Sequence, residues 1–384
     1  MKKSNKGVSA VSRKIWLRRS IKKDPCVPGK WKKQSIYKLG FAAAYETCTT
    51  STQYFAGTWG NVFRSLLATS IELKWLDNGP GIGRDAKIAY SSLFGRYMAR
   101  AHLIDRENVR ILVPLEIFRK ELQKNNLYHM EKKPGKNRLE ADWIGLDNRG
   151  LVIAEAKGSF NLAKAPWEGD KSVPPLLLGA MKQAERTKIY CSSTGKPLPA
   201  RYWAVASRWA NENNGVDPTT IAWGKGGGKR KGYNNLNVAN LILRADLNSL
   251  LKGLGHPKIE DLQRKDSGTL VRYDGDFELR VGDQTVGPGF LTAVSSTWNY
   301  PLRTEEDVSR FFSFSEFVDH RSPYIAVVSL SSHYISKVIQ NQPMEILETS
   351  SKIEINEVEE GVCFAKFSGL TVVWLRSLTD FELW

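Results

Sequence analysis

The amino-acid sequence predicts an α/β fold, and the order of its elements supports that class. Residues 84–104, RDAKIAYSSLFGRYMARAHLI, carry apolar side chains at helical spacing. Three strand-like runs follow over 109–118, 138–146 and 151–159, and a helix over 176–191 then precedes a strand over 200–210. Helices and strands in this order predict helical layers packed on a sheet.

The chain divides into three predicted parts. The breaker DNGPGIG at 77–83 separates a basic, partly helical N-terminal region, 1–80, from the α/β portion, 81–255. Residues 256–384 contain further strand-like runs, such as YIAVVSLSS and GLTVVWLRSL, and predict an additional α+β domain. We expect this domain to read a target, to sense a signal, or to bind a second copy of the chain or a partner protein.

Positive charge is concentrated in two segments of a chain whose net charge is +16. Residues 1–40 hold ten Lys and three Arg against a single acid, Asp24, and residues 223–235, WGKGGGKRKGYNN, form a second basic segment without the spacing of a P-loop. Such segments suit a polyanion, with nucleic acid first, and the alternative is a solvated tail. The expected phosphate-binding side chains are Arg18, Arg19, Lys22, Lys23, Lys225, Lys229, Arg230 and Lys231.

The sequence predicts a cytoplasmic protein without a membrane segment. No stretch approaches the roughly 18 to 20 apolar residues that a membrane span needs, and the basic N-terminus has no apolar core of a secretory signal. The four cysteines are far apart and form no CxxC pair, so we expect reduced thiols and no zinc site.

A predicted hairpin places two carboxylates face to face. The turn DNRG at 147–150 joins two strand-like runs, and with Asn148 and Arg149 at its tip Asp142 lies opposite Glu155. Facing carboxylates repel each other unless a cation lies between them, and Mg²⁺ prefers oxygen ligands. Lys157 follows Glu155 by two residues and shares its face of the strand. The alternative is a solvated Glu155–Lys157 pair at the end of an edge strand.

These residues resemble the motif of the PD-(D/E)xK, or restriction-endonuclease-like, nuclease superfamily. Asp142 is followed by twelve residues and then by Glu155-Ala156-Lys157, and the resemblance covers residues 84–210. It implies a mixed central sheet flanked by helices. It also implies that Asp142, Glu155 and the backbone carbonyl of Ala156 bind Mg²⁺ or Mn²⁺, while Lys157 assists the attacking water.

The chain departs from the family pattern at two positions. Ala141 stands where the pattern has Pro, and the first helix offers only Ser and Arg in SSLFGRYMAR, where many members carry Glu. The number of metals therefore stays open. Glu116 and Glu140 are the candidates to compensate, and Gln183 matches a supporting Gln on the following helix.

The expected function is that of a Mg²⁺-dependent phosphodiester hydrolase, and in particular of a DNA endonuclease in restriction, phage defence or a mobile element. The alternative is a catalytically inactive subunit that keeps the nuclease fold and binds or assembles on nucleic acid. RNA as the substrate, and exonuclease rather than endonuclease cleavage, also stay open.

Overall fold

The computed structural model describes most of the chain. The described residues are 12–21, 25–50, 63, 66–68, 70–79, 83–130, 140–160, 167–168, 172–226, 236–256, 258–259, 279–281, 284–286, 289–294, 299–302, 325–349, 352–357 and 363–375.

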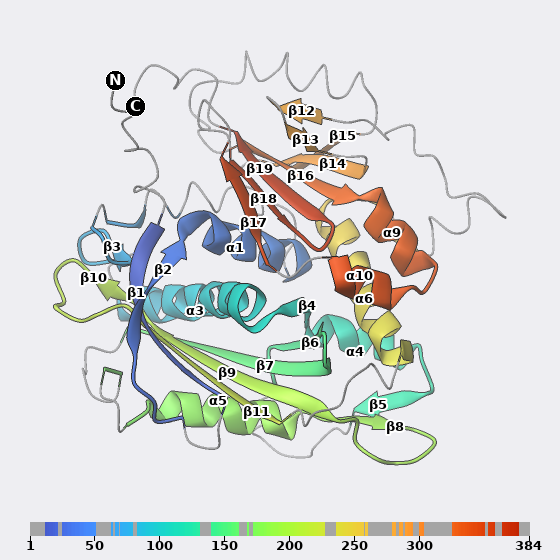
Figure 1. The fold of residues 1–384 in the computed structure, drawn as a ribbon, viewed down its shortest axis with the longest axis horizontal. Coiled ribbons are helices and arrows are strands. Elements are labelled where there is room, and N and C mark those ends of the chain that lie inside the picture. Colours follow the sequence, from blue (N-terminus) through green and yellow to red (C-terminus); the bar gives the residue numbers. More distant parts are fainter. Residues whose placement is uncertain are drawn as a thin grey trace.

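A mixed seven-stranded sheet forms the centre of the described structure (Figure 1). β1 is parallel to β11 and β7 is parallel to β9, while all other neighbours are antiparallel. The α/β class predicted from the sequence is thereby confirmed. In sheet order the strands are β2 (Lys30–Ser35), β1 (Ser12–Ser20), β11 (Thr219–Gly226), β9 (Ala200–Arg208), β7 (Gly150–Ser159), β6 (Trp143–Asp147) and β4 (Val109–Pro114).

Helices cover both faces of this sheet, and β7 shows why (Figure 1). Val152, Ala154 and Ala156 belong to the large core on the α3 side, whereas Ile153 packs with Ala184 of α5 on the other side. Successive strand residues point to opposite faces, so a strand that is apolar at every position needs cover on both. The covering helices are α3 (Arg84–Glu107), with α1 (Ile36–Thr50) and α6 (Leu236–Gly253) beyond it, and α5 (Pro175–Arg186) on the opposite face.

A second, six-stranded sheet lies in the C-terminal portion and shares the core of the first. Tyr37 of α1 packs against Trp374 with ring centroids 5.5 Å apart, and Phe41 packs against Phe367 at 6.4 Å. The strands, in sheet order, are β15 (Asn299–Leu302), β14 (Gly289–Val294), β16 (Ile325–Ser331), β19 (Leu370–Leu375), β18 (Cys363–Phe367) and β17 (Glu354–Glu357). Helices α9 (Ser332–Ile339) and α10 (Pro343–Thr349) accompany them.

Three strand pairs complete the described elements. They are β3 (Lys74–Trp75) with β10 (Ala210–Asn211), β5 (Tyr128–Met130) with β8 (Ile189–Cys191), and β12 (Leu279–Val281) with β13 (Gln284–Val286). Among the described helices, none is both long and apolar enough to cross a bilayer.

The N-terminal segment differs from the sequence expectation, because β1 and β2 are strands of the central sheet. Ile15 and Leu17 are buried at alternate positions of β1, which is the period of a strand. The basic residues between and after them hide this alternation in the sequence. The N-terminal region is therefore not separate from the α/β portion.

The strand expected over 109–118 is also shorter than predicted. β4 ends at Pro114, and residues 115–123 form helix α4 (Leu115–Gln123). Leu115, Phe118 and Leu122 are buried at helical spacing, which explains the change of element. The helix expected over 176–191 likewise ends at Arg186, before β8.

A buried carboxyl group joins three helices behind the sheet. Asp246 of α6 accepts hydrogen bonds at Oδ2 from the hydroxyls of Tyr45 on α1, at 2.7 Å, and of Tyr334 on α9, at 2.8 Å. Burial raises the pKa of Asp246 to about 6, although the two hydroxyls oppose that shift. Because both bonds use one oxygen, an amide at this position can keep them.

We predict that Asp246→Asn removes a pH dependence of stability. A carboxyl group with a raised pKa stabilises the fold below its unfolded pKa and loses that contribution as the pH rises through its folded pKa. With a folded pKa of about 6 and an unfolded pKa of about 3.9, the free energy of unfolding of the wild type should fall by on the order of 3 kcal/mol relative to Asp246→Asn as the pH rises from below the unfolded pKa to above the folded one. Urea denaturation across this range measures the difference, and a constant difference would contradict the prediction.

Candidate active site

The β6–β7 hairpin has the register that the sequence predicts. Trp143 pairs with Ala154 and Asp147 pairs with Gly150, which leaves a two-residue tip. The Asp147 Oδ1 accepts the backbone N–H of Arg149 at 2.6 Å and that of Gly150 at 3.1 Å, so the turn closes on its own side chain. Gly150 has a φ of 131°, which favours glycine.

Asp142 and Glu155 face each other just beyond the last pair of this ladder. The backbone N–H of Asp142 donates to Glu155 Oε2 at 2.8 Å, and the backbone N–H of Ala156 donates to Asp142 Oδ2 at 2.8 Å. Glu155 is 1 % exposed, and β7 lies between β6 and β9. The alternative of a solvated pair on an edge strand is therefore wrong.

The two carboxyl groups resist ionisation together. Burial raises the pKa of Asp142 above its ordinary value, although the Arg96 guanidinium opposes the shift. Burial, and next the charge of Asp142, raise the pKa of Glu155 to about 8 against the opposing effect of Lys157. Further positive charge at this point would stabilise the doubly ionised pair.

Lys157 and Gln183 extend this cluster of polar side chains toward solvent. The Lys157 ammonium donates to Glu155 Oε1 and, at 3.2 Å, to Oε1 of Gln183 on α5. The Gln183 amide in turn donates to the backbone carbonyl of Glu140. The structure thus brings together Asp142, Glu155, Lys157 and Gln183, and the Lys157 side chain is about one-third exposed.

The two other predicted acids do not add carboxylates to this cluster. Glu116 is exposed on α4, and the Glu140 carboxylate forms an ion pair with Arg119. Glu140 contributes its backbone carbonyl to Gln183 instead. Tyr190, which follows Gln183 by seven residues, lies in β8 and stacks on His129 with ring centroids 5.5 Å apart.

The structure adds Glu46 of α1, which the sequence analysis missed. Arg96 of α3 bridges it to Asp142, since its Nε donates to Glu46 Oε1 at 3.0 Å and its Nη1 donates to Asp142 Oδ1. Arg100 Nε donates to Glu46 Oε2 at 2.8 Å, and the Trp143 indole donates to the same oxygen at 3.0 Å. Burial alone would raise the pKa of Glu46, but Arg100 and Arg96 hold it below its ordinary value.

A signal for Glu46 exists in the sequence. It is the only charged residue in the stretch LGFAAAYETCTT, 39–50, so a buried helix carries one acid that needs a partner. Its partners are Arg96 and Arg100, two of the arginines of the first predicted helix. An arginine therefore lies near the position where the family pattern has Glu, and a carboxylate reaches it from another helix.

The two carboxylates and one carbonyl form a donor set that suits Mg²⁺. In each carboxylate, one oxygen accepts a hydrogen bond from a backbone N–H and the other accepts one from a side-chain cation. The cation is Arg96 for Asp142 and Lys157 for Glu155. The carbonyl of Ala156 faces the same neighbouring strand as its N–H. The described residues contain no group of three or more His, Cys, Asp or Glu arranged for a metal, but Mg²⁺ needs only one or two carboxylates and keeps several waters.

The predicted phosphate-binding residue Arg18 is buried, which corrects that expectation. Its Nε donates to the carbonyl of Val27 at 3.0 Å, and its side chain is closed off from solvent. Arg18 precedes Arg19 in a strand, so the two side chains point to opposite faces of the sheet. Arg19 is partly exposed but forms a two-bond ion pair with Glu107.

Lys225 is the described member of the second basic segment. Its ammonium lies 3.0 Å from Glu185 and 4.1 Å from the centroid of the Trp223 ring, and its side chain is partly exposed. The remaining predicted phosphate-binding residues lie outside the described part of the chain. They are Lys22, Lys23, Lys229, Arg230 and Lys231.

Two glycines allow α3 to lie directly on β7 beside Lys157. A Cβ at Gly158 would lie 1.6 Å from the carbonyl oxygen of Ser91, and one at Gly95 would lie 2.5 Å from the Gly158 Cα. Both contacts are closer than atoms can approach, so the backbones of helix and strand touch only because side chains are absent.

We predict that Gly158→Ala lowers the free energy of unfolding by at least about 2 kcal/mol, because a new methyl group must push the helix away from the strand. Gly179→Ala on the exposed face of α5 is the matched control. No atom lies within 4 Å of its added Cβ, and it should raise stability by up to about 1 kcal/mol. Urea denaturation of both variants measures the contrast, and equal effects would contradict the close approach.

Comparison with protein-family models, with curated proteins and with solved structures gives no match for this chain.

Proposed function

We propose that this protein is a metal-dependent nuclease that hydrolyses phosphodiester bonds, with DNA as its substrate. The observation that carries the proposal is the buried pair of Asp142 and Glu155, held face to face by their own backbone N–H groups, with Lys157 on the same face. The order α3, β4, β6, β7, α5, β9 around this pair supports the resemblance to the restriction-endonuclease-like core. The net charge of +16 supports a polyanionic substrate.

Asp142, Glu155 and the Ala156 carbonyl would hold Mg²⁺ or Mn²⁺. A bound divalent ion of this kind lowers the pKa of water and neutralises charge on phosphate oxygens. The pair fits such an ion because burial and mutual repulsion disfavour the doubly ionised state without one.

Lys157 has the geometry of a residue that meets substrate. Its ammonium is partly exposed, while the carboxylate beneath it is buried. Gln183 and Glu155 hold the ammonium from two sides, so its position is fixed before substrate arrives. From there it can orient the attacking water or stabilise negative charge that develops on the phosphoryl oxygens.

One observation favours the second candidate, a nucleic-acid-binding subunit without catalysis. All four oxygens of Asp142 and Glu155 already accept hydrogen bonds from groups of the chain, and Arg96 occupies one of the oxygens that would face a metal. Cleavage of a supercoiled plasmid in Mg²⁺, compared with the same reaction in EDTA, distinguishes the two candidates. A parallel reaction on RNA tests the choice of substrate.

We predict that Asp142→Asn, Glu155→Gln and Lys157→Ala each reduce Mg²⁺-dependent cleavage by at least about 100-fold, because each removes a group that binds or stabilises charge at the reacting phosphate. Glu116→Gln is the matched control, since this acid is exposed on α4 and should leave the rate unchanged. Plasmid nicking rates measure the effect, and thermal melting checks the fold. Full activity in Asp142→Asn would refute the assignment.

We predict that Arg96→Met strengthens Mn²⁺ binding by about tenfold, because the guanidinium and the metal compete for Asp142 and repel each other. Glu46 keeps Arg100 and the Trp143 indole as partners in this variant. Arg119→Met, which breaks the nearby pair with Glu140, is the control and should change affinity little. Calorimetric titration with Mn²⁺ measures both. Weaker binding in Arg96→Met would mean that the arginine holds Asp142 in place for the metal.

A further inference from the structure

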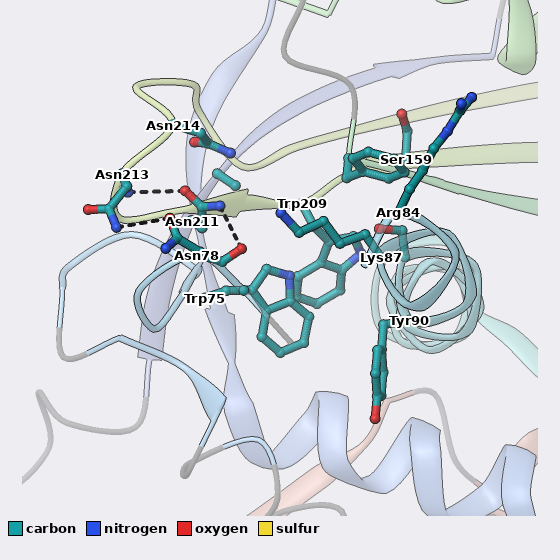
Figure 2. A pocket seen from close by; sticks show the side chains of 14 residues that line it. Trp75, Asn78, Arg84, Lys87, Tyr90, Ser159, Trp209, Asn211, Asn213 and Asn214 are labelled. Carbon is teal, nitrogen blue, oxygen red and sulfur yellow. Dashed lines mark hydrogen bonds between the residues drawn. The ribbon is translucent and has the colours of Figure 1, made fainter. Parts of the chain in front are cut away.

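An open pocket of about 720 Å³ lies where β7 and β9 end (Figure 2). Ser159, the last residue of β7, lines it, as does Trp209, which follows β9 and donates its backbone N–H to the Ser159 carbonyl at 2.9 Å. Ligands of α/β proteins commonly bind outside the carboxyl ends of parallel strands, and pockets for small molecules span about 300–1,000 Å³. The remaining lining residues are Phe160 after β7 and residues of β3, of α3, of β10 and of the turns after β3 and β10.

Asparagine side chains form one side of the pocket (Figure 2). The Asn211 amide donates to the Asn78 carbonyl at 3.0 Å, and the Asn213 amide donates to Asn78 Oδ1 at 3.2 Å. Asn214 Oδ1 accepts the backbone N–H of Val216 at 3.3 Å. These bonds fix the side chains, and within the described residues the amide NH₂ groups of Asn78 and Asn214 have no acceptor of their own.

Two cations from the start of α3 form the other side. Figure 2 shows the Lys87 side chain extending toward the asparagines and Arg84 extending past Ser159. Neither side chain has an ion pair or hydrogen bond with any other described residue, whereas Arg96 and Arg100 of the same helix are both paired. Two cations on one side of a pocket that form no ion pair with another described residue favour an anionic ligand.

The floor between these sides is aromatic. Trp75 and Trp209 stack with ring centroids 4.8 Å apart, and both are buried. The Trp209 indole N–H is buried and has no acceptor among the described residues, so the ring contributes an apolar surface beneath the pocket. A suitable ligand would have an anionic group for the two cations, polar atoms that can hydrogen-bond to the asparagine amides, and a flat ring that can pack over the aromatic floor.

We propose that this pocket binds one nucleotide of a single-stranded segment of the substrate. Arg84 and Lys87 would bind its phosphates, and the asparagine amides would meet the edge of the unpaired base. Ser159 follows Lys157 by two strand residues, or about 7 Å, which is roughly two steps of a stacked nucleic-acid strand. This inference rests on the proposed nuclease function and extends it to substrates with unpaired nucleotides near the cleavage site.

The test measures binding without cleavage. The full chain carrying Glu155→Gln is titrated in EDTA with a fluorescein-labelled single strand of about twelve nucleotides and with the duplex of the same sequence. In this background Arg84→Ala with Lys87→Ala should weaken single-strand binding by about tenfold. The slope of log affinity against log salt should fall by about 1.4, or ~0.7 for each lost phosphate contact.

Two control variants separate the contribution of the pocket cations to binding from the effect of net positive charge. Lys252→Ala with Lys258→Ala removes the same charge at and after the end of α6, which lies across the molecule from β3 and β10 in Figure 1, and should weaken binding little. Arg84→Lys with Lys87→Arg keeps both charges and should retain the salt slope. A loss equal to that of the Lys252 and Lys258 control would overturn the proposal. So would an equal loss for duplex and single strand, because the two cations would then contact backbone phosphates alone.

The outcome is independent of the nuclease test. If the wild type cleaves DNA in Mg²⁺ while the Arg84 and Lys87 variant binds like the control, the pocket proposal fails and the nuclease proposal stands. If single-strand binding depends on Arg84 and Lys87 but no metal supports cleavage, the pocket stands and the nuclease proposal fails.

Discussion

The burial of two facing carboxyl groups is the constraint on which the rest of this structure depends. Asp142 and Glu155 lie where an antiparallel ladder ends, and each uses a backbone N–H of the opposite strand as a fixed donor. Such groups are costly to bury unless positive charge surrounds them. Lys157 supplies that charge from the same strand, and Arg96 supplies it from α3. The packing of α3 on β7 places Arg96 beside Asp142, and the packing of α5 on the other face brings Gln183 to Lys157.

The same requirement draws in the N-terminal part of the chain. Arg96 also faces Glu46, so the charge balance of the site extends to α1, and α1 in turn packs against the C-terminal sheet through Tyr37 and Phe41. Asp246 ties α1 to α6 and α9 behind this contact. The site, the N-terminal segment and the C-terminal sheet are therefore parts of one core.

Local sequence patterns predicted the features that depend on neighbours along the chain. The DNRG turn and two apolar runs fixed the hairpin register, and that register alone brought Asp142 opposite Glu155. Features that depend on distant contacts were not predictable in this way. Arg18 was expected at a phosphate and is buried against Val27, because nothing local distinguishes it from Arg19. The Glu46–Arg96 pair joins residues fifty positions apart. Helical periodicity describes contacts within one helix, so it could not predict that these two residues meet.

The glutamates predicted to compensate for the absent Glu of the first helix also show that distant contacts cannot be predicted from local sequence. Glu116 follows the first strand-like run of the predicted core, yet the chain turns into α4 at Pro114 and leaves this side chain exposed. The acid that reaches the site comes from α1 instead, where Glu46 is the single acid of a largely apolar helix. A lone acid in a buried helix was the better guide than proximity in the sequence.

The glycine contact between α3 and β7 has a consequence for how a substrate would be cut. Because Gly95 and Gly158 bring the two backbones into direct contact, the helix that carries Arg84 and Lys87 cannot slide along the strand that carries Glu155 and Lys157. The proposed nucleotide pocket and the carboxylate pair are then held at a fixed distance from each other. A strand anchored in the pocket would present the same phosphodiester bond to the carboxylate pair each time, so the cleavage position would be set by length measured from the anchored nucleotide.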